Sequence, residues 1–333
     1  MVSVSVDDQI AAAVPLLATA EDVTLLAHVN PDADALGSAL ALGLALHRRG
    51  ARVRVSFGGP EQTPESLRGL DSAGLIVPAE AVPAAPPLLV ALDTGSVDRL
   101  GALADRVAAT TEAGGTVLVV DHHVSNTRYG THHVVDDRAE ATAVLVLRLL
   151  DALDVPLDEP IARCLYAGLA TDTVSFRFAG PAAHRSAARL LESGVDAPAM
   201  LRQLMDSHPF GWLHMLSTVL GRAQLEPEAA QGVGLVHTHI RLADHEGLRA
   251  EEVESVVDVV RTTAEAGVAA VFKEFAQGEW TVSLRSTGAL DVRSAAQRLG
   301  GGGHRMAAGF TAYGEPGQVL AELRAALDQA TLL

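Results

Sequence analysis

The chain has 333 residues, of which 48% are hydrophobic and 20% are charged, and its 41 acidic and 25 basic residues give a formal net charge of −16. This composition is typical of a folded globular protein long enough for two domains, and it argues against a disordered or repetitive chain. The acidic balance disfavours long duplex DNA as a partner, because an acidic surface repels polyanions.

The sequence carries no sign of membrane insertion or secretion. No apolar run approaches the roughly 20 residues that a membrane-spanning helix needs, and the N-terminus lacks the pattern of a signal peptide. We therefore expect a cytoplasmic protein that contacts no membrane. The single cysteine, Cys164, excludes an internal disulfide and a thiolate metal cluster, and its apolar helical surroundings predict a buried packing role.

The first half of the chain alternates short apolar runs with helical stretches rich in alanine and leucine. The apolar runs have the length of buried strands and lie at 23–27, 52–57, 88–92 and 116–120. Strands that alternate with helices in this way form a parallel sheet with both faces covered. We predict a doubly wound α/β domain over residues 1–195.

The second half changes character twice. A mostly helical region runs from about residue 139 to 222, and we predict that it completes the first domain and supplies a helical linker over 196–229. Beyond it, three apolar runs predict strands, the last two joined as a hairpin: "GVGLVHTHI", "VAAVFKEFA" and "WTVSLRS". With helices predicted near 249–265, 291–299 and 317–329, these strands indicate a smaller α/β domain over 230–333.

Acidic and histidine side chains follow three of the predicted strands where each strand ends. They are His28, Asp32 and Asp34 after the first, Asp93 after the third, and Asp121, His122 and His123 after the fourth, with Asp172 at the end of a helical stretch. Any one of these aspartates alone is more often a helix cap or turn residue. Ligands of open α/β sheets, however, collect at the carboxyl ends of the strands, and converging carboxylates need a cation between them. Oxygen and imidazole ligands without thiolates favour Mn²⁺, with Mg²⁺, iron or Co²⁺ as alternatives, and this many groups suits two ions.

Four motifs in this part of the chain resemble those of the DHH phosphoesterase superfamily: "HVNPDADALGS", "ALDTG", "VDHHVSN" and "LATDTVSFR". Two later stretches, "SLRS" and "GGGGHRMAAG", resemble the DHHA1 domain that follows it in one branch. The resemblance covers nearly the whole chain. Motif order and spacing are similar to the NrnA type, which comprises compact oligoribonucleases and 3′-phosphoadenosine-5′-phosphate phosphatases, with relatives that cleave cyclic di-AMP or its linear product.

The resemblance implies a role for each motif residue. One ion would be held by His28, Asp32 and Asp93, and the other by Asp34, Asp93, His122 and Asp172, with Asp93 bridging. A water between the ions would be the nucleophile. Asp121 would orient a histidine, and His123 would reach the phosphate or the leaving oxygen.

The resemblance also assigns substrate binding to the second domain. The terminal phosphate or nucleotide would be bound opposite the metals by Arg285, Ser286, Gly301, Gly302, Gly303 and His304, and Arg177 is a weaker phosphate candidate. The glycines alone could instead form a flexible linker or the end of a helix, but His304 follows them directly and favours binding. His237 and His239 lie two apart in a predicted strand, and we expect them on a partly exposed face rather than at a metal.

We therefore expect a manganese-dependent phosphoesterase that acts on short nucleotides, and the resemblance implies a homodimer. A RecJ-like exonuclease on long single strands is disfavoured, because aromatic residues are only 4% of the chain. A family II inorganic pyrophosphatase would have a different second domain, and a non-catalytic nucleotide sensor would not need the intact ligand set. The choice among pApA, short oligoribonucleotides, 3′-phosphoadenosine-5′-phosphate and cyclic di-AMP stays open.

Overall fold

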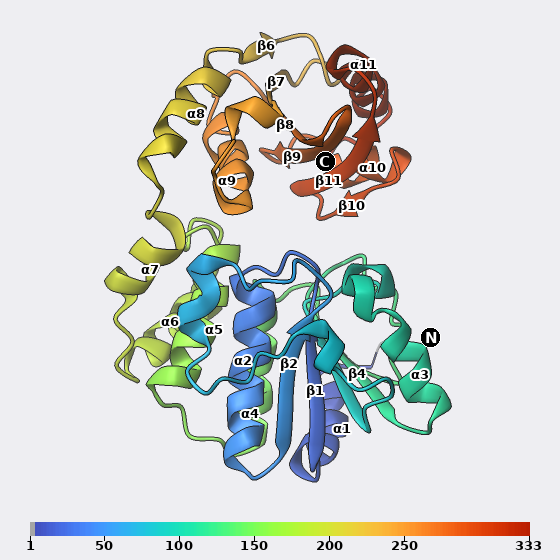
Figure 1. Cartoon of the computed structure of the whole chain (residues 1–333), viewed down its shortest axis with the longest axis vertical. Coiled ribbons are helices and arrows are strands. Elements are labelled where there is room, and N and C mark those ends of the chain that lie inside the picture. Colours follow the sequence, from blue (N-terminus) through green and yellow to red (C-terminus); the bar gives the residue numbers. More distant parts are fainter. Residues whose placement is uncertain (1–3) are drawn as a thin grey trace. The chain divides into compact units, whose positions relative to one another are not determined.

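The computed structural model describes residues 4–333, and the chain divides into two compact units (Figure 1). The first unit ends at Ser207 and the second comprises His208–Leu333. The segment predicted as a linker, 196–229, is shared between them: α7 (Ala197–Met205) belongs to the first unit and α8 (Phe210–Leu220) begins the second.

The first unit is built on a sheet of five parallel strands in the order β2-β1-β3-β4-β5. The strands are β1 (Asp22–Ala27), β2 (Arg52–Phe57), β3 (Leu88–Leu92), β4 (Thr116–Asp121) and β5 (His132–Val135). The first four coincide with the predicted apolar runs, and β5 adds an edge strand. Strand order reverses between β1 and β3, which makes their carboxyl ends the switch point where doubly wound sheets bind ligands.

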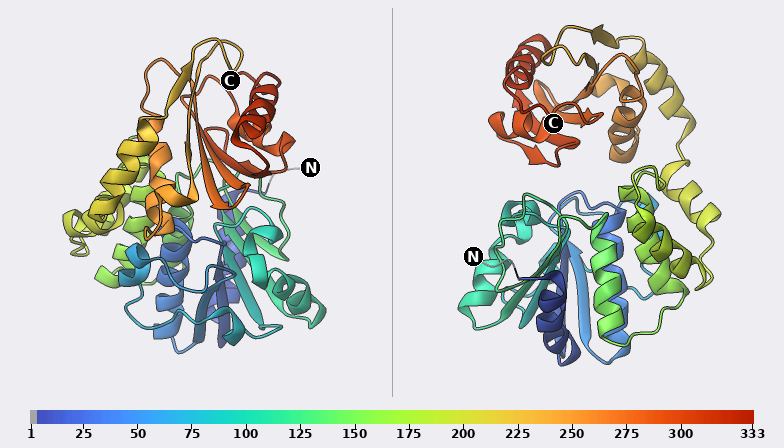
Figure 2. Two further views of the ribbon diagram at one scale, coloured as in Figure 1. Left: turned by 45° about the horizontal axis from the view of Figure 1, so that its top comes forward. Right: turned by 180° about the vertical axis from the view of Figure 1, so that it is seen from behind.

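Both faces of this sheet are covered, which confirms the predicted doubly wound architecture (Figure 2). On one face the core contains side chains of α1 (Val6–Ala18), α2 (Ala33–Arg48), α4 (Thr142–Ala152), α5 (Glu159–Asp172), α6 (Pro181–Leu191) and the short η1 (Glu65–Leu70). On the other face it contains side chains of η3 (Val97–Leu103) and α3 (Asp105–Glu112). Burial on both faces explains why these strands are continuous apolar runs.

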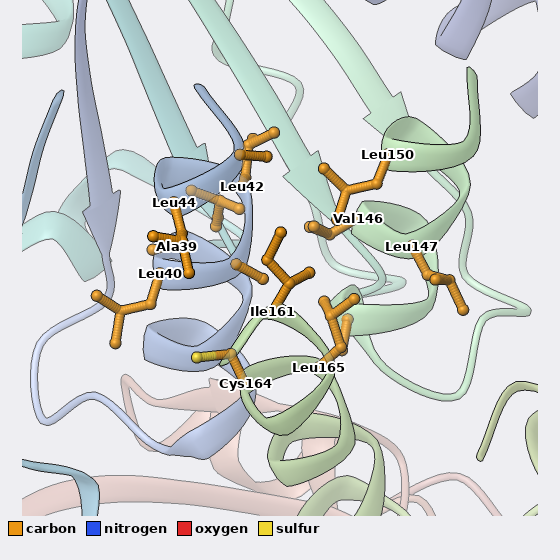
Figure 3. Close-up of a cluster of buried hydrophobic side chains, with 14 of the residues drawn as sticks. Ala39, Leu40, Leu42, Leu44, Val146, Leu147, Leu150, Ile161, Cys164 and Leu165 are labelled. Atoms are coloured by element: carbon orange, nitrogen blue, oxygen red, sulfur yellow. The ribbon is translucent and has the colours of Figure 1, made fainter. Parts of the chain in front are cut away.

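Helices α2, α4 and α5 pack closely through aliphatic side chains (Figure 3). A Cβ on Gly37 of α2 would lie 2.5 Å from the carbonyl oxygen of Cys164 on α5, so glycine is required for this approach. The Cys164 thiol is buried and donates to the carbonyl of Leu70, and burial raises its pKa to about 12. It is therefore a protonated packing residue, as predicted.

The second unit contains a mixed six-stranded sheet in the order β10-β11-β9-β8-β7-β6. Its strands are β6 (Gln224–Glu226), β7 (Leu235–Ile240), β8 (Val268–Ala276), β9 (Glu279–Ser286), β10 (Gly302–Gly303) and β11 (Ala307–Tyr313). Helices α8 and α9 (Ala250–Val260) pack on one face, and α10 (Val292–Arg298) and α11 (Pro316–Leu327) on the other. The predicted hairpin is confirmed, since β8 and β9 pair antiparallel.

Helix α9 is shorter than predicted. The sequence pattern extends it to residue 265, but it ends at Val260 because the hydroxyls of Thr262 and Thr263 donate to the carbonyls of Val259 and Val260. Throughout residues 4–333, no helix is both long enough and apolar enough to span a membrane.

Candidate active site

Side chains that can act as metal ligands gather in three groups around the loops that follow β1, β3 and β4. In each group one ligand atom per residue lies within 4.8 Å of the others: His28, Asp32 and Asp93; Asp34, His122 and Asp172; and Asp93, Asp121 and His123. The structure thus brings all six predicted metal ligands together, and Asp93 belongs to two groups. The grouping follows from the fold, because parallel strands end at one edge of the sheet.

The first group centres on His28, directly after β1. Its Nε2 lies 3.5 Å from Oδ2 of Asp32 and 3.5 Å from Oδ2 of Asp93. Asp32 is also the N-cap of α2, since its Oδ1 accepts from the amides of Asp34 and Ala35 at 3.1 and 2.9 Å. One oxygen of Asp32 therefore caps the helix while the other faces the histidine.

The second group centres on His122, directly after β4. Its Nε2 lies 3.2 Å from Oδ2 of Asp172, the last residue of α5, and 3.4 Å from Oδ1 of Asp93. Asp93 follows β3 with a φ of +55°, in the left-handed region that costs a non-glycine residue energy. Its two carboxylate oxygens thus face the two histidines separately, as a bridging ligand would require.

Both central histidines are oriented by the backbone. The Nδ1–H of His28 donates to the carbonyl of Val29 at 2.8 Å, and that of His122 donates to the carbonyl of Ala139 at 3.1 Å. A carbonyl only accepts, so the proton is fixed on Nδ1 and Nε2 carries the lone pair in the neutral ring. The nitrogen that faces the carboxylates is therefore the one able to bind a cation.

The electrostatics of the two groups favour the binding of positive charge. Burial, and then the charges of Asp172 and Asp93, raise the pKa of Asp34 well above its usual range. Burial also raises the pKa of Asp172 to about 6, although its histidine partner opposes the shift. Burial disfavours protonation of His28 and His122, but their carboxylate neighbours outweigh it and raise the pKa values to about 10 and about 11. The carboxylates of both groups thus stabilise positive charge at the imidazoles, and a bound cation would be stabilised in the same way.

The third group has a different internal arrangement. Oδ1 of the buried Asp121 accepts from Nδ1 of His123 at 2.6 Å, and Oδ2 accepts from the side-chain amide of Asn126 at 2.6 Å. Both oxygens of Asp121 are therefore engaged in holding neighbours. Asn126 lies inside the stretch "VDHHVSN" but was not predicted as a site residue, because its contact depends on the turn after β4.

A glycine in α5 leaves room for Asp34. A Cβ on Gly168 would lie 2.6 Å from Oδ1 of Asp34 and 2.9 Å from its Cα. We expect Gly168→Ala to lower the free energy of unfolding of the metal-free protein by roughly 1–3 kcal/mol, because the Cα of Asp34 cannot move away from the new methyl group without shifting the backbone of α2. At a solvent-exposed position inside a helix, replacing glycine with alanine instead raises the free energy of unfolding by about 1 kcal/mol. Urea unfolding measures the difference.

Gly317 provides the matched control for that substitution. It lies in α11, and a Cβ there would meet nothing within 4 Å. Gly317→Ala should therefore leave stability unchanged or raise it. Equal stability of Gly168→Ala and wild type would contradict the close approach of α5 to Asp34.

The predicted substrate-binding residues of the second unit gather at one end of its sheet. Arg285 and Ser286 close β9, where Arg285 pairs with Ala307 at the start of β11. The amide of Ser286 donates to the carbonyl of Met306 at 2.8 Å, and the amide of His304 donates to the carbonyl of Ala307 at 2.7 Å. His304 therefore lies in the turn that leads into β11, beside the end of β9.

The glycine run before His304 serves the fold at three of its four positions. Gly300 follows α10 with a φ of +79°, and Gly303 has a φ of +132°. A Cβ on Gly301 would lie 2.1 Å from the carbonyl oxygen of Gly309. A Cβ on Gly302, in contrast, would meet nothing within 4 Å. The helix-end interpretation is thus correct for the start of the run, whereas Gly302 is required neither by a positive φ nor by a close backbone approach, so a ligand could approach the backbone there.

Two other predicted positions have different outcomes. Arg177 is exposed in the turn after Asp172, and within residues 4–333 its guanidinium has no ion pair. The expectation of a partly exposed face for His237 was wrong: it is 7% exposed, and its Nε2 lies 2.7 Å from Oε1 of Glu226. The short strand β6 pairs antiparallel with β7 and places Glu226 within hydrogen-bond distance of the histidine.

Comparisons with known proteins agree with the motif resemblance. Residues 22–169 match the DHH family N-terminal domain, and residues 232–331 match the DHHA1 domain. The chain is 34% identical over 296 residues to the bifunctional oligoribonuclease and PAP phosphatase NrnA of Thermus thermophilus, covering 88% of this chain and 84% of that protein. It is 26% identical over 291 residues to a probable protein of the same name from Streptococcus mutans, covering 86% and 88%. A solved structure of an exopolyphosphatase-related protein from Bacteroides fragilis has the same fold, with a TM-score of 0.85 at 21% identity over 97% of this chain and 96% of that one.

The first matched region contains the side chains that follow β1, β3 and β4, and the second contains Arg285 and His304. Asp172 lies three residues beyond the first region, at the end of α5, most of which falls within the matched residues. The identity to the Thermus thermophilus protein extends across both regions. The resemblance expected from the motifs is therefore confirmed, and the chain belongs to the DHH family of phosphoesterases, with a DHH domain followed by a DHHA1 domain.

Proposed function

We propose that this protein is a two-metal phosphoesterase that hydrolyses short nucleotides to mononucleotides, with Mn²⁺ as its metal. The observation that supports this most is the position of Asp93 between the two ligand groups, with Oδ2 3.5 Å from Nε2 of His28 in the first group and Oδ1 3.4 Å from Nε2 of His122 in the second. One ion would be held by His28, Asp32 and Asp93, and the other by Asp34, Asp93, His122 and Asp172. Imidazole nitrogens and carboxylate oxygens without thiolates suit Mn²⁺.

The bound ions would make a water nucleophilic at neutral pH and neutralise the phosphate oxygens. Side chains of the protein would orient the substrate and donate protons to it. Burial disfavours the charged form of His123, but the hydrogen bond to Asp121 outweighs it and raises the pKa of His123. With Nδ1 held by Asp121, Nε2 is the nitrogen that would donate to a phosphate or leaving oxygen.

Short nucleotides are the substrate class supported by similarity and charge. The Thermus thermophilus relative is an oligoribonuclease and PAP phosphatase, and a net charge of −16 disfavours long polyanions. In this proposal Arg285, Ser286, Gly302 and His304 bind the phosphate or nucleotide, and Arg177 adds a phosphate contact. The homodimer and the cytoplasmic location expected from the sequence stay predictions.

Turnover of a substrate panel tests the proposal. Metal-free protein would be reloaded with Mn²⁺, Mg²⁺ or Co²⁺ and offered pApA, short oligoribonucleotides, 3′-phosphoadenosine-5′-phosphate and cyclic di-AMP, with a long single-stranded DNA as the comparison. We expect hydrolysis of at least one short substrate with Mn²⁺ and little action on the long strand. Preference for the long strand would favour a RecJ-like exonuclease, and no hydrolysis with any metal would overturn the proposal.

Metal binding should release protons. The pKa values of His28 and His122, raised to about 10 and about 11, keep both imidazoles protonated at pH 7 in the metal-free protein. A cation needs the neutral imidazole, so binding of both ions should release about two protons or more. Affinity should therefore rise with pH between 7 and the raised pKa values. Calorimetry at pH 7 in buffers of different ionisation enthalpy checks this, and a binding enthalpy that does not depend on the buffer would contradict it.

A further inference from the structure

Helix α4 begins at the site with a residue to which the sequence motifs assign no role. Thr142 is fully buried, and its hydroxyl donates to Oδ1 of Asp93 at 2.9 Å. Its amide donates to Oδ2 of Asp34 at 2.7 Å, and the amide of Ala143 donates to Oδ1 of Asp34 at 2.8 Å. One residue thus contacts a carboxylate from each of two other elements, the end of β3 and the start of α2.

The contact with Asp34 explains an unusual helix start. The N-cap of α4 is Ala141, whose side chain cannot accept from the first free amides of the helix. Asp34 accepts from two of these amides with its two oxygens, so it caps a helix more than a hundred residues away in the sequence. The positive end of α4 then faces the carboxylate and fixes its plane.

The contact with Asp93 fixes the other carboxylate. Oδ1 of Asp93 accepts from Thr142 and lies 3.4 Å from Nε2 of His122, whereas Oδ2 lies 3.5 Å from Nε2 of His28. If the carboxylate of Asp93 rotated about its Cβ–Cγ bond, Oδ1 would no longer face His122 and Oδ2 would no longer face His28. The side chain of Thr142 is uncharged. Its hydrogen bond can therefore fix the plane of the Asp93 carboxylate without adding charge to the site.

We propose that Thr142 is the positioning residue of this site, which aligns Asp93 with both metal groups through its hydroxyl and Asp34 with the second group through its amide. The inference rests on the proposed function, because it requires that these groups bind divalent ions. It adds that metal affinity depends on a neutral hydroxyl that binds no metal itself. Outer hydrogen bonds of this kind typically contribute about 10–100-fold to metal affinity.

The test compares Mn²⁺ binding by metal-free variants in a calorimeter. Thr142→Val keeps the shape and removes the hydroxyl, and we expect a loss of about 10–100-fold in affinity for at least one ion. Thr142→Ser keeps the hydroxyl and should bind within a few-fold of wild type. The matched control is Thr24→Val, since Thr24 is equally buried in β1 and its hydroxyl has no hydrogen-bond partner among residues 4–333. This control should bind Mn²⁺ as wild type does.

The outcomes separate the two proposals. Wild-type protein that binds no Mn²⁺ would overturn the proposed function, whereas normal binding by Thr142→Val would overturn only the role of Thr142. Thermal melting of each metal-free variant accompanies the titration, and Thr142→Ala replaces Thr142→Val if the latter does not melt cooperatively. If both fail to fold while Thr142→Ser folds, the hydroxyl serves the fold itself and the inference is wrong.

Discussion

Replacing Asp93 with asparagine should abolish hydrolysis of short nucleotides. Burial opposes ionisation of Asp93, but His28, His123 and His122 outweigh it and hold its pKa well below the usual range, so the residue is anionic at any working pH. The substitution Asp93→Asn would keep the shape of the side chain and remove its charge from both metal groups at once. We expect kcat to fall by about 10³-fold or more, because several kcal/mol of charge stabilisation depend on the ions.

Metal analysis of the same variant gives the second readout. Bound metal should fall from two ions per chain toward one or none, because a bridging carboxylate serves both. Asp137→Asn is the matched control, since Asp137 is an exposed aspartate outside the ligand groups and its substitution should change neither quantity. Two ions retained with activity near that of wild type would remove Asp93 from the site.

Replacing His304 or Arg285 with alanine should impair substrate handling and leave metal binding intact. Nη1 of Arg285 donates to the carbonyl of Leu284 at 3.2 Å and Nε lies 3.8 Å from Oδ1 of Asp258, so the donors of Nη2 remain for a ligand. Each charge-assisted contact to a phosphate is worth roughly 1.5–3 kcal/mol, which predicts a loss of about 10- to 150-fold in kcat/KM on pApA. The loss should be small on bis-p-nitrophenyl phosphate, which has no nucleotide to bind.

The control for these variants is Arg298→Ala. Arg298 lies on α10 of the same unit, and its guanidinium donates to Gln329. This variant should process both substrates as wild type does. If His304→Ala and Arg285→Ala also process pApA normally, the DHHA1 residues bind no substrate, and if they lose metal, the two units are coupled in metal binding.

The positions of the metal-ligand candidates could be predicted because they depend on sheet geometry. Each of β1, β3 and β4 is an apolar run that ends at, or directly before, a histidine or aspartate, and parallel strands end at one edge. The residues around them could not be predicted in the same way. Thr142 meets Asp93 across 49 positions in the sequence, and nothing local distinguishes it from an ordinary residue in the first turn of a helix.

The second unit was less predictable for a related reason. Strands β6 and β10 have three and two residues, too few for a periodic pattern, so the contact of the buried His237 with Glu226 of β6 was missed. The sequence did not decide whether the glycine run serves the fold or binds a ligand, because close packing of two backbone segments and close approach of a ligand to the backbone both favour glycine. Only the neighbours of each position separate the two cases: Gly301 lies against β11, whereas Gly302 lies against open space.

In the proposed function, hydrolysis of a short nucleotide requires that the residues around Asp93 hold two ions. The most direct test titrates metal-free protein with Mn²⁺ while recording bound metal and pApA turnover in the same samples. Our account predicts that turnover stays low at one equivalent, reaches its maximum at two equivalents, and is absent in Asp93→Asn at every ratio. Full turnover with one ion or none, or turnover that survives in Asp93→Asn, would contradict the claim.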